Sequence, residues 1–396
     1  MHERALATVA VDRGLVGGPF GSDLVGADYV DDGVPVIRGA NMLRRYVGGD
    51  FAFVTPDKFA RDLARNNAVP GDLIFTQRGT LGQVAVVPRG QHAEYVVSQS
   101  QMRLRVDEEI ADPTFVYYAC SGQEFLNQIN DNAISTGVPH TNLGILARLT
   151  IPDRPIQEQH AIAEVLGALD DKMSANDRIR ALVDEVAMAR FRRLSAGRRP
   201  ARMADLAVIN AGVTKPKPGA SLRYIDISSV SQGDYVLPDE SSWDDAPGRA
   251  RRVVSAGDTV WSTVRPNRRS HALVLDDDPL LIASTGLAVL SPRAGRIAGV
   301  YEATRTEQFA SYLESVAEGS AYPAVRAERF AEAPIPELDA ADWDHFEEFA
   351  LPLRYRAHAA GVESRRLAAT RDALLPLLMS GKIRVRDAEK LVEEVV

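Results

Sequence analysis

The stretch IQEQHAIAEVLGALDDKMSANDRIRALVDEVAMARFRRL, residues 156–194, decides the fold. It contains no proline and only one glycine, and its apolar residues recur at a spacing of three and four, which is typical of a coiled-coil helix. Globular helices usually run for ~8–20 residues, so a helix of this length predicts a helical partner. A polar residue at a seam position, such as Asn176, can fix the register. The predicted seam consists of Ile162, Val165, Leu169, Asn176, Ile179 and Val183.

A second long helix is predicted near the end of the chain, from about Asp342 to Ser380. Pro352 falls within its first turns, where it either kinks the helix or marks its true beginning. Two long helices from one chain can pair antiparallel, and we predict that these two do. The seam of the second helix is predicted to use Phe346, Phe349, Leu353, Leu367, Leu374 and Leu377.

Each predicted helix follows a segment rich in predicted strands. Runs of β-branched residues such as DLIFTQ, from Asp72, and GDTVWSTV, from Gly257, are bounded by glycine, proline and aspartate. One helix is expected inside the first segment, over residues 113–129. We therefore predict a mixed α+β protein of the α/β class. Its parts are globular domains at 1–152 and 198–338, a central long helix at 153–197, and a C-terminal long helix with a tail at 339–396.

The two halves are predicted to be an internal repeat, because matching residues recur in order at a nearly constant offset. Single glycine or proline coincidences are common, but five in order are hard to reach by chance. A duplicated chain with paired helices predicts a pseudo-two-fold body. At an offset of 186 residues, Gly71-Asp72 matches Gly257-Asp258 and Ser98 matches Ser284. At an offset of 184 residues, Pro139 matches Pro323, Pro152 matches Pro336 and Gly197 matches Gly381.

The composition is that of an ordinary cored protein, with 396 residues, 45% hydrophobic residues and a net charge of -8. The single cysteine excludes an internal disulfide and fits a reducing compartment. No apolar run approaches the ~20 residues of a membrane span, and the first residues lack the apolar core of a signal peptide. We expect a cytoplasmic protein. The acidic balance counts mildly against nucleic-acid binding, although phosphate contact needs only a local basic strip.

The sequence carries none of the common catalytic motifs. We find no GxxxxGK[ST] loop, no GxGxxG after a strand, and no HExxH or Cys/His metal spacing. Ser98 and Ser284 lie in predicted strands without a nearby His/Asp pair, which argues against a nucleophile. We therefore predict no catalytic residue, no metal site and no cofactor in this chain.

Several stretches resemble specificity subunits of type I restriction–modification systems. The most specific are residues 151–179, IPDRPIQEQHAIAEVLGALDDKMSANDRI, and residues 367–385, LAATRDALLPLLMSGKIRV, which are similar to the family's two helical spacer regions. The stretches VPGDLIFTQRGTLGQVAVVP, VSQSQMRL and ISTGVPHTNLGILARLTIP resemble a target-recognition domain. The second domain departs from this pattern, with WSTVRPNRR (261–269) and AEGSAYPAVRAERF (317–330) at the corresponding places.

The resemblance implies a DNA-binding subunit without chemistry of its own. Each target-recognition domain would read one half of a bipartite sequence in double-stranded DNA. The paired helices would act as a ruler and as a docking surface for two modification subunits. Those partners would bind S-adenosylmethionine and methylate adenine N6, and restriction (motor-nuclease) subunits would join for cleavage.

Candidate DNA-binding residues are loop-borne side chains suited to bases or phosphates, although each could also be an ordinary solvated polar residue. The RPNRR run, residues 265–269, is the sharpest basic cluster and occupies the loop equivalent to residues 77–80. In the first domain the candidates are Ser22, Arg38, Asn41, Gln77, Arg78, Thr80, His140 and Asn142. In the second they are Lys215, Lys217, Ser228, Ser229, Arg265, Asn267, Arg268, Arg269, Tyr322 and Arg326.

Two rival interpretations stay open at this point. A duplicated scaffold that binds only protein is favoured slightly by the net charge of -8 and opposed by the RPNRR loop. A fused modification enzyme is opposed by the missing cofactor and catalytic motifs.

Overall fold

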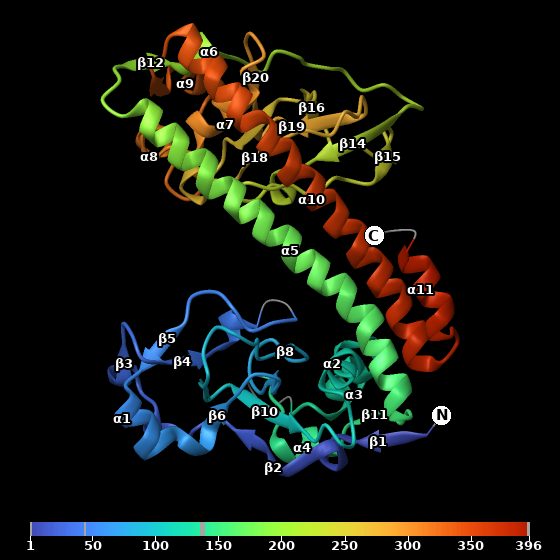
Figure 1. Ribbon diagram of the computed structural model, residues 1–396. Helices are drawn as coiled ribbons and strands as arrows, with labels where there is room; N and C mark the ends of the chain where they lie inside the picture. Colours follow the sequence, from blue (N-terminus) through green and yellow to red (C-terminus); the bar gives the residue numbers. More distant parts are fainter. Residues whose placement is uncertain (1, 43–44, 135–138, 394–396) are drawn as a thin grey trace. The chain divides into compact units, whose positions relative to one another are not determined.

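The structure is a computed structural model that describes residues 2–42, 45–134 and 139–393. The chain divides into two compact units (Figure 1). Unit 1 comprises Met1–Ala175 and Glu363–Val396, and unit 2 comprises Asn176–Val362. Each unit therefore contains one strand-rich body and a part of each long helix.

The body of unit 1 is built on two sheets and a short strand pair. One sheet is antiparallel and has the order β2-β10-β7-β8; the other has the order β3-β5-β4-β9-β6, with β4 and β9 parallel. The first sheet consists of β2 (Ala10–Gly17), β10 (Gln101–Val106), β7 (Leu73–Thr76) and β8 (Val84–Val86). The second consists of β3 (Tyr29–Val30), β5 (Ala52–Val54), β4 (Val34–Ile37), β9 (Tyr95–Val97) and β6 (Asn67–Ala68). The short pair is β1 (Glu3–Ala5) with β11 (Thr150–Pro152).

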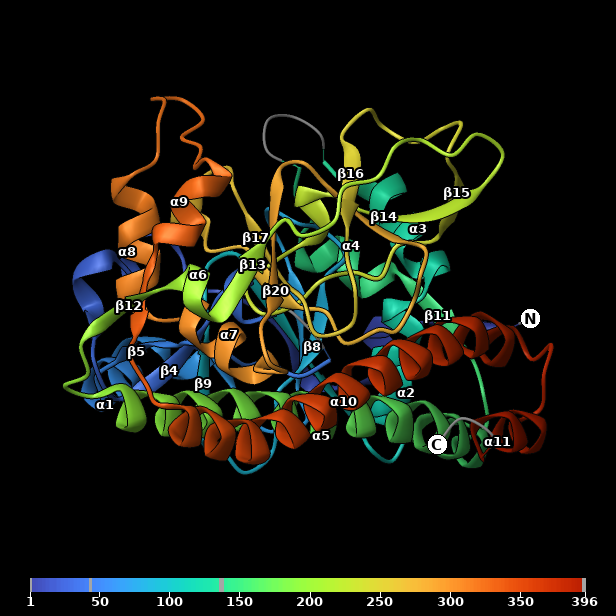
Figure 2. The same cartoon turned by 90° about the horizontal axis from the view of Figure 1, so that it is seen from above.

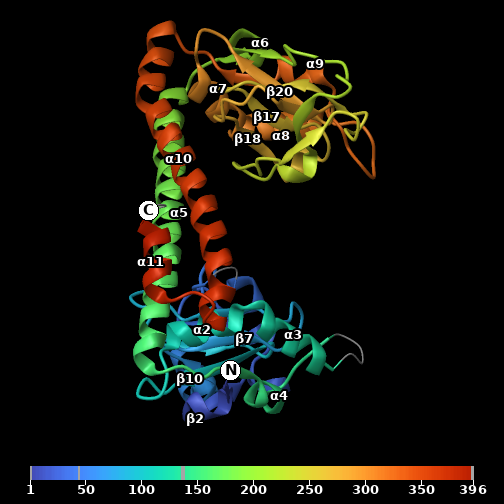
Figure 3. The ribbon, with the colours of Figure 1, turned by 90° about the vertical axis from the view of Figure 1, so that its right-hand side faces the viewer.

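Two helices of unit 1 replace the single helix expected over residues 113–129. They are α2 (Pro113–Ser121) and α3 (Gln123–Asn132), and the chain is extended at Gly122 between them. Asp112 caps α2, since its Oδ1 accepts a hydrogen bond from the Phe115 amide at 2.8 Å. Helix α2 lies beside the unit 1 parts of the long helices (Figure 3), and its apolar residues pack in one core with β7, β10 and these helix parts.

Unit 2 repeats this topology. Its antiparallel sheet has the order β13-β20-β17-β18, and its mixed sheet has the order β15-β14-β19-β16, with β14 and β19 parallel. The strands are β13 (Ala207–Ile209), β20 (Leu287–Pro292), β17 (Thr259–Ser262), β18 (His271–Leu273), β15 (Glu240–Ser242), β14 (Ser221–Ile225), β19 (Leu281–Ser284) and β16 (Ala250–Val253). The pair β12 (Pro200–Arg202) with β21 (Pro334–Pro336) matches β1 with β11. The helices of this body are α6 (Met203–Leu206), α7 (Ile297–Thr304), α8 (Glu307–Ser315) and α9 (Ala327–Glu332). Helices α7 and α8 correspond to α2 and α3 of unit 1, and α9 corresponds to α4 (Leu143–Arg148).

The predicted internal repeat is also visible in single turns. Gly71 and Gly257 have left-handed backbone, with φ of 95° and 96°. The aspartate that follows each glycine closes the turn in the same way. Oδ2 of Asp72 accepts from the Val69 amide, and Oδ2 of Asp258 accepts from the Ser255 amide, both at 2.8 Å.

The two predicted long helices are present as α5 (Ile156–Ser195) and α10 (Ala340–Ser380), and a short α11 (Val385–Glu393) follows. Pro352 lies inside α10 and neither begins nor ends it. The two helices run antiparallel in each unit, because pairing positions rise along α5 as they fall along α10. In unit 1 Asp170 pairs with Arg371 at 2.7 Å and Lys172 with Glu363 at 3.4 Å. In unit 2 Asp184 pairs with Arg354, and the rings of Phe191 and Phe346 are 5.3 Å apart.

Most of the predicted seam is buried, but two positions need correction. Phe349 and Leu377 are 38% and 37% exposed, whereas the next residues, Ala350 and Leu378, are almost fully buried. The three-and-four spacing from Phe346 runs through Ala350 and reaches Leu378, so Phe349 and Leu377 lie one position off the seam. Ile179 and Leu353 are half-buried. The buried members of the predicted set are Ile162, Val165, Leu169, Asn176, Val183, Phe346, Leu367 and Leu374.

Within the described ranges, no helix is both long and apolar enough to cross a membrane. Nor do the residues that the structure describes contain a group of three or more His, Cys, Asp or Glu side chains able to hold a metal ion.

Candidate nucleic-acid interface

Unit 1 brings two predicted loops together into what we call the first loop pair, residues 77–83 and 139–142. The amide of Thr141 donates to the Gln77 carbonyl at 2.9 Å, and Arg78 and His140 form an antiparallel bridge. Arg78 and Thr80 are exposed, and Gln77, His140 and Asn142 are half-buried. Five candidates from distant parts of the sequence are therefore neighbours. Residues 135–138 of the ISTGVPH stretch lie outside the described residues.

The first loop pair is shaped by two glycines in left-handed conformation. Gly79 has φ of 103° and Gly82 has φ of 87°, a region that side chains with a Cβ atom rarely adopt. The base of the loop is closed where the Thr76 hydroxyl donates to Oε1 of Gln83 at 3.1 Å. The loop thus leaves β7 and returns into β8 with Arg78 and Thr80 on its exposed part.

The other candidates of unit 1 lie outside this pair or serve the local fold. Asn41 is buried; its Oδ1 accepts from the Arg38 amide and its Nδ2 donates to the carbonyls of Gly48 and Asp50, each at 3.0 Å. Its amide group is therefore used inside the protein, which argues against Asn41 as a DNA-binding residue. Asn142 caps α4, with its Oδ1 accepting from the Ile145 amide at 2.9 Å. Ser22 is exposed and Arg38 is half-buried, both on separate loops.

Unit 2 contains the corresponding second loop pair, residues 263–270 and 318–326. The amide of Val325 donates to the Thr263 carbonyl at 2.8 Å, and Val264 and Ala324 form the bridge. These contacts repeat those of unit 1 at the same offsets, 263 − 77 = 186 and 325 − 141 = 184. The loop that connects α8 with α9 projects from the body of unit 2 (Figure 2).

The arginines of the RPNRR run differ in what they contact. Arg269 makes two hydrogen bonds to the Glu307 carboxylate, at 2.7 and 2.6 Å, which raise the pKa of Arg269 and lower that of Glu307. Arg268 and Asn267 are exposed. The Arg265 guanidinium lies over the Tyr322 ring, 4.5 Å from its centroid. The charge of Arg269 is thus largely compensated by Glu307, whereas the charges of Arg265 and Arg268 are available to bind a ligand.

The remaining candidates of unit 2 are spread over three loops. Lys215 and Lys217 are exposed before β14. Ser228 and Ser229 serve a turn, since their hydroxyls donate to Oδ1 and to the backbone carbonyl of Asp226, at 2.9 and 2.8 Å.

Two further contacts complete the surroundings of the second loop pair. Arg326 pairs with Glu318 at 2.9 Å, so its charge is compensated within the pair. The sequence did not single out Gln232, whose Nε2 donates to the Arg268 carbonyl at 3.0 Å and brings the loop after Ser229 against the RPNRR run. This contact is visible only in the folded structure, because no sequence motif around Gln232 predicts it.

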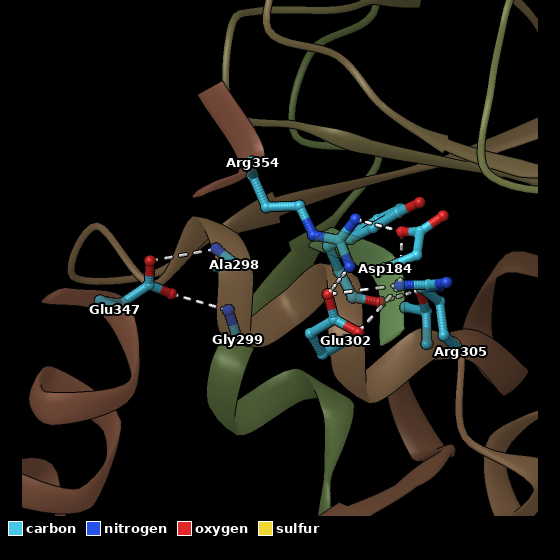
Figure 4. A network of polar contacts seen from close by, with 9 residues as sticks. Asp184, Ala298, Gly299, Glu302, Arg305, Glu347 and Arg354 are labelled. Atoms are coloured by element: carbon cyan, nitrogen blue, oxygen red, sulfur yellow. Dashed lines mark hydrogen bonds and ion pairs between the residues drawn. The ribbon is translucent and has the colours of Figure 1, made fainter. Parts of the chain in front are cut away.

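A buried charge network holds the body of unit 2 against the helices (Figure 4). Glu302 of α7 is fully buried and pairs with Arg354 of α10 and, at 3.1 Å, with Arg305. Asp184 of α5 pairs with the same two arginines. Burial raises the pKa of Glu302. Glu347 of α10 accepts from the amides of Ala298 and Gly299, at 3.1 and 2.7 Å, and so caps the first turn of α7.

Unit 1 attaches its body to the helices through different groups. The Tyr118 hydroxyl of α2 donates to Asp170 of α5 at 2.6 Å, and Asp170 pairs with Arg371 of α10. Arg45 donates to the Gly167 carbonyl at 3.2 Å and pairs with Asp171 at 3.1 Å.

Comparison with known proteins shows which family model and which solved structures this chain is similar to. Residues 31–184 match the family model of the type I restriction modification DNA specificity domain, and no curated protein matches the chain. The S subunit of the type I restriction–modification system from M. genitalium is similar over 95% of both chains, with 16% identity and a TM-score of 0.59. The HsdS subunit from Thermoanaerobacter tengcongensis matches with 15% identity, 96% and 97% coverage and a TM-score of 0.37. A structure described as the basis of complex assembly and conformational transition of the type I R-M system matches with 18% identity, the same coverage and a TM-score of 0.39.

The two repeated α/β bodies and the two long helices of this chain form a fold that is similar to that of the M. genitalium S subunit. Residues 31–184 match the type I restriction modification DNA specificity domain, and the fold of the chain is similar to that of a type I S subunit. The resemblance seen in the sequence is thereby confirmed.

Proposed function

We propose that this chain is the sequence-specific DNA-binding subunit of a type I restriction–modification complex and that each unit reads one half of a bipartite target. The observation that carries the proposal is that the topology of the DNA specificity domain at residues 31–184 recurs in unit 2. The recurrence includes the loop pair, with its backbone contacts at matching offsets. One chain would then carry two reading surfaces.

Side chains of the loop pairs have the chemistry that this function needs. Arginine can bind guanine through two hydrogen bonds, and glutamine or asparagine can bind adenine in the same way. The first loop pair offers Gln77 and Arg78, and the second offers Asn267 and Arg268. Lys215, Lys217 and Thr80 suit phosphate contacts. A local cationic surface of this kind supports DNA binding by a chain whose net charge is -8.

We further propose that the long helices dock two modification subunits, which would bind S-adenosylmethionine and methylate adenine N6. Restriction subunits would join this complex, and the chain itself would be non-catalytic. Exposed apolar residues of the helices support docking: Leu182 and Val186 of α5 are 50% and 46% exposed. They lie on successive turns with Arg190, whose guanidinium is 5.8 Å from the Phe349 ring of α10. Apolar side chains exposed on one helix face in this way are suited to contact with a protein partner.

The alternative is a duplicated scaffold that binds protein without reading DNA, and a gel-shift experiment separates the two. The full chain would be mixed with duplex DNA alone and together with the methyltransferase subunit of its system. We expect a sequence-dependent shift that strengthens with the partner, since the partner would add contacts to the phosphates. Complex formation with the partner, but no shift beyond that of the partner by itself, would support the scaffold and contradict our proposal.

A further inference from the structure

The internal repeat reveals two arginines at backbone positions that hold glycine in the other unit. The loop of unit 1 at residues 77–83 has left-handed glycines at positions 79 and 82. The loop of unit 2 at residues 263–270 is one residue longer and has Arg265 and Arg269 there, each with φ of 52°. The offsets are 265 − 79 = 186 and 269 − 82 = 187, as the longer loop requires. Left-handed backbone at these positions is thus unstrained in unit 1, where the residues are glycines, and strained in unit 2, where they are arginines.

Left-handed backbone is unfavourable for any residue with a Cβ atom, and such strain is concentrated at binding sites and at positions fixed by surrounding contacts. Arg269 has a clear structural reason. Its guanidinium binds the Glu307 carboxylate twice, and its Nε lies 3.8 Å from Glu314, so it ties the loop to α8. Its backbone strain is offset by these contacts.

Arg265 has no such reason within the part of the chain that the structure describes. No carboxylate pairs with its guanidinium there, and its one strong side-chain contact is the stack on Tyr322, which is itself 68% exposed. The backbone around it is firmly held, since the Arg265 amide donates to the Pro323 carbonyl at 2.7 Å and its carbonyl accepts from the Arg268 amide at 2.9 Å. The loop therefore presents a stacked guanidinium whose hydrogen-bonding edges are available.

We infer that Arg265 is a specificity-determining residue of unit 2 that reads a guanine, and that Tyr322 is a positioning residue that holds its guanidinium in the reading orientation. A planar guanidinium fits the O6 and N7 atoms of guanine with two hydrogen bonds. A ring beneath it restricts its rotation, so less conformational freedom is lost on binding. This inference rests on the proposed DNA-binding function and assigns the residue that carries part of it.

The test is a selection from a pool of double-stranded oligonucleotides with a randomised central region, using the full chain assembled with its methyltransferase subunits. Sequencing of the bound fraction gives the base preference at each position. The variant Arg265→Gly restores the glycine that unit 1 has at this place. We expect it to lose the guanine preference at one position of one half-site, at least ten-fold, and to leave the other half-site unchanged.

Arg13→Gly is the matched control. Arg13 also has left-handed backbone, with φ of 56°, and its side chain is 92% exposed. The substitution removes the same charge and adds the same backbone freedom in unit 1, and we expect an unchanged motif. Both glycine variants should melt no lower than the unsubstituted chain, because each relieves left-handed strain. A clear drop in Tm for Arg265→Gly would make Arg265 a structural residue and overturn the inference.

Tyr322 is tested by a conservative and a disruptive variant. Tyr322→Phe keeps the ring and should keep the guanine preference, whereas Tyr322→Ala should reduce it several-fold at an unchanged Tm. Full preference in Tyr322→Ala would overturn the positioning role.

The remaining outcomes are also decisive. A uniform loss of binding by Arg265→Gly with the motif intact would mean a phosphate contact and would overturn base reading. If the unsubstituted complex enriched no motif at all, the proposed function would fail, which is distinguishable from failure of the Arg265 assignment alone.

Discussion

Asp170 and Arg354 occupy equivalent positions of the two long helices, 354 − 170 = 184 residues apart, and carry opposite charges. Asp170 accepts from Tyr118 of α2, and Arg354 binds Glu302 of α7. Tyr118 and Glu302 are equivalent as well, since 302 − 118 = 184. The two bodies therefore contact the long helices at equivalent positions, but the helix residue is an acid in unit 1 and a base in unit 2. A buried carboxylate such as Glu302 suits an arginine on its helix and would be repelled by an aspartate.

Removal of Arg354 should destabilise unit 2 strongly, because it leaves the fully buried Glu302 without its main partner. For Arg354→Met we expect a loss of about 3–5 kcal/mol in the free energy of unfolding. The double variant Glu302→Gln with Arg354→Met should recover much of this, since no unpaired charge stays buried. All three tryptophans, Trp243, Trp261 and Trp343, lie in unit 2, so urea unfolding followed by tryptophan fluorescence reports on it. A single variant as stable as the double variant would contradict this account.

The corrected helix register can be tested at two adjacent leucines of α10. Leu378 is 1% exposed and packs in the core of unit 1, whereas Leu377 is 37% exposed. We expect Leu378→Ala to cost about 2–5 kcal/mol of unfolding free energy. Leu377→Ala should cost about 0.5 kcal/mol or less, as is usual at the surface. Urea unfolding followed by circular dichroism gives both values, and equal losses would restore the register expected from the sequence.

His271 should make unit 2 sensitive to acid. Burial lowers the pKa of His271 from its usual 6.5 to about 4, although its Nδ1 donates to the Arg269 carbonyl at 2.6 Å. The folded protein thus binds fewer protons here than the unfolded chain, so this contribution is complete above pH 6.5 and is lost as the pH falls toward 4. The loss amounts to roughly 3 kcal/mol.

The matched variant is His271→Val, because unit 1 has Val84 at the equivalent place, 271 − 84 = 187. Other titrating groups are common to both proteins and cancel in the comparison. The variant should lose less stability than the unsubstituted chain between pH 7 and pH 4, as measured by urea unfolding with tryptophan fluorescence. Parallel pH profiles would show that His271 is not the group responsible.

The long helices and the repeat could be predicted from the sequence because their signals are local or periodic. A three-and-four spacing over residues 156–194 needs no knowledge of the tertiary fold. The roles of single loop residues could not, since they depend on partners far away in the sequence. Asn41 has the side chain of a base reader, yet its amide is used by Gly48 and Asp50. Phe349 is the larger and more apolar side chain, yet the helix register buries the smaller Ala350 instead.

The ruler role of the helices, which the family resemblance implies, predicts the effect of lengthening them. One heptad inserted after Ala175 and one after Val362 would extend the helix pair by ~10 Å, or ~3 base pairs. We expect the altered protein to prefer the same bases in each half-site with a longer gap, and to bind less tightly because the half-sites also rotate about the DNA axis. Selection from a randomised duplex pool measures both. An unchanged gap, or changed base preferences, would show that the helices are not the ruler.

The most direct test of the central claim, that one chain reads two half-sites, is the methylome of the host with and without this gene. Single-molecule sequencing detects N6-methyladenine at every site. We predict that deletion of the gene abolishes methylation at one interrupted motif, made of two short defined sequences separated by a gap of fixed length. Methylation that persists without the gene, or the loss of a continuous motif with no gap, would contradict the account.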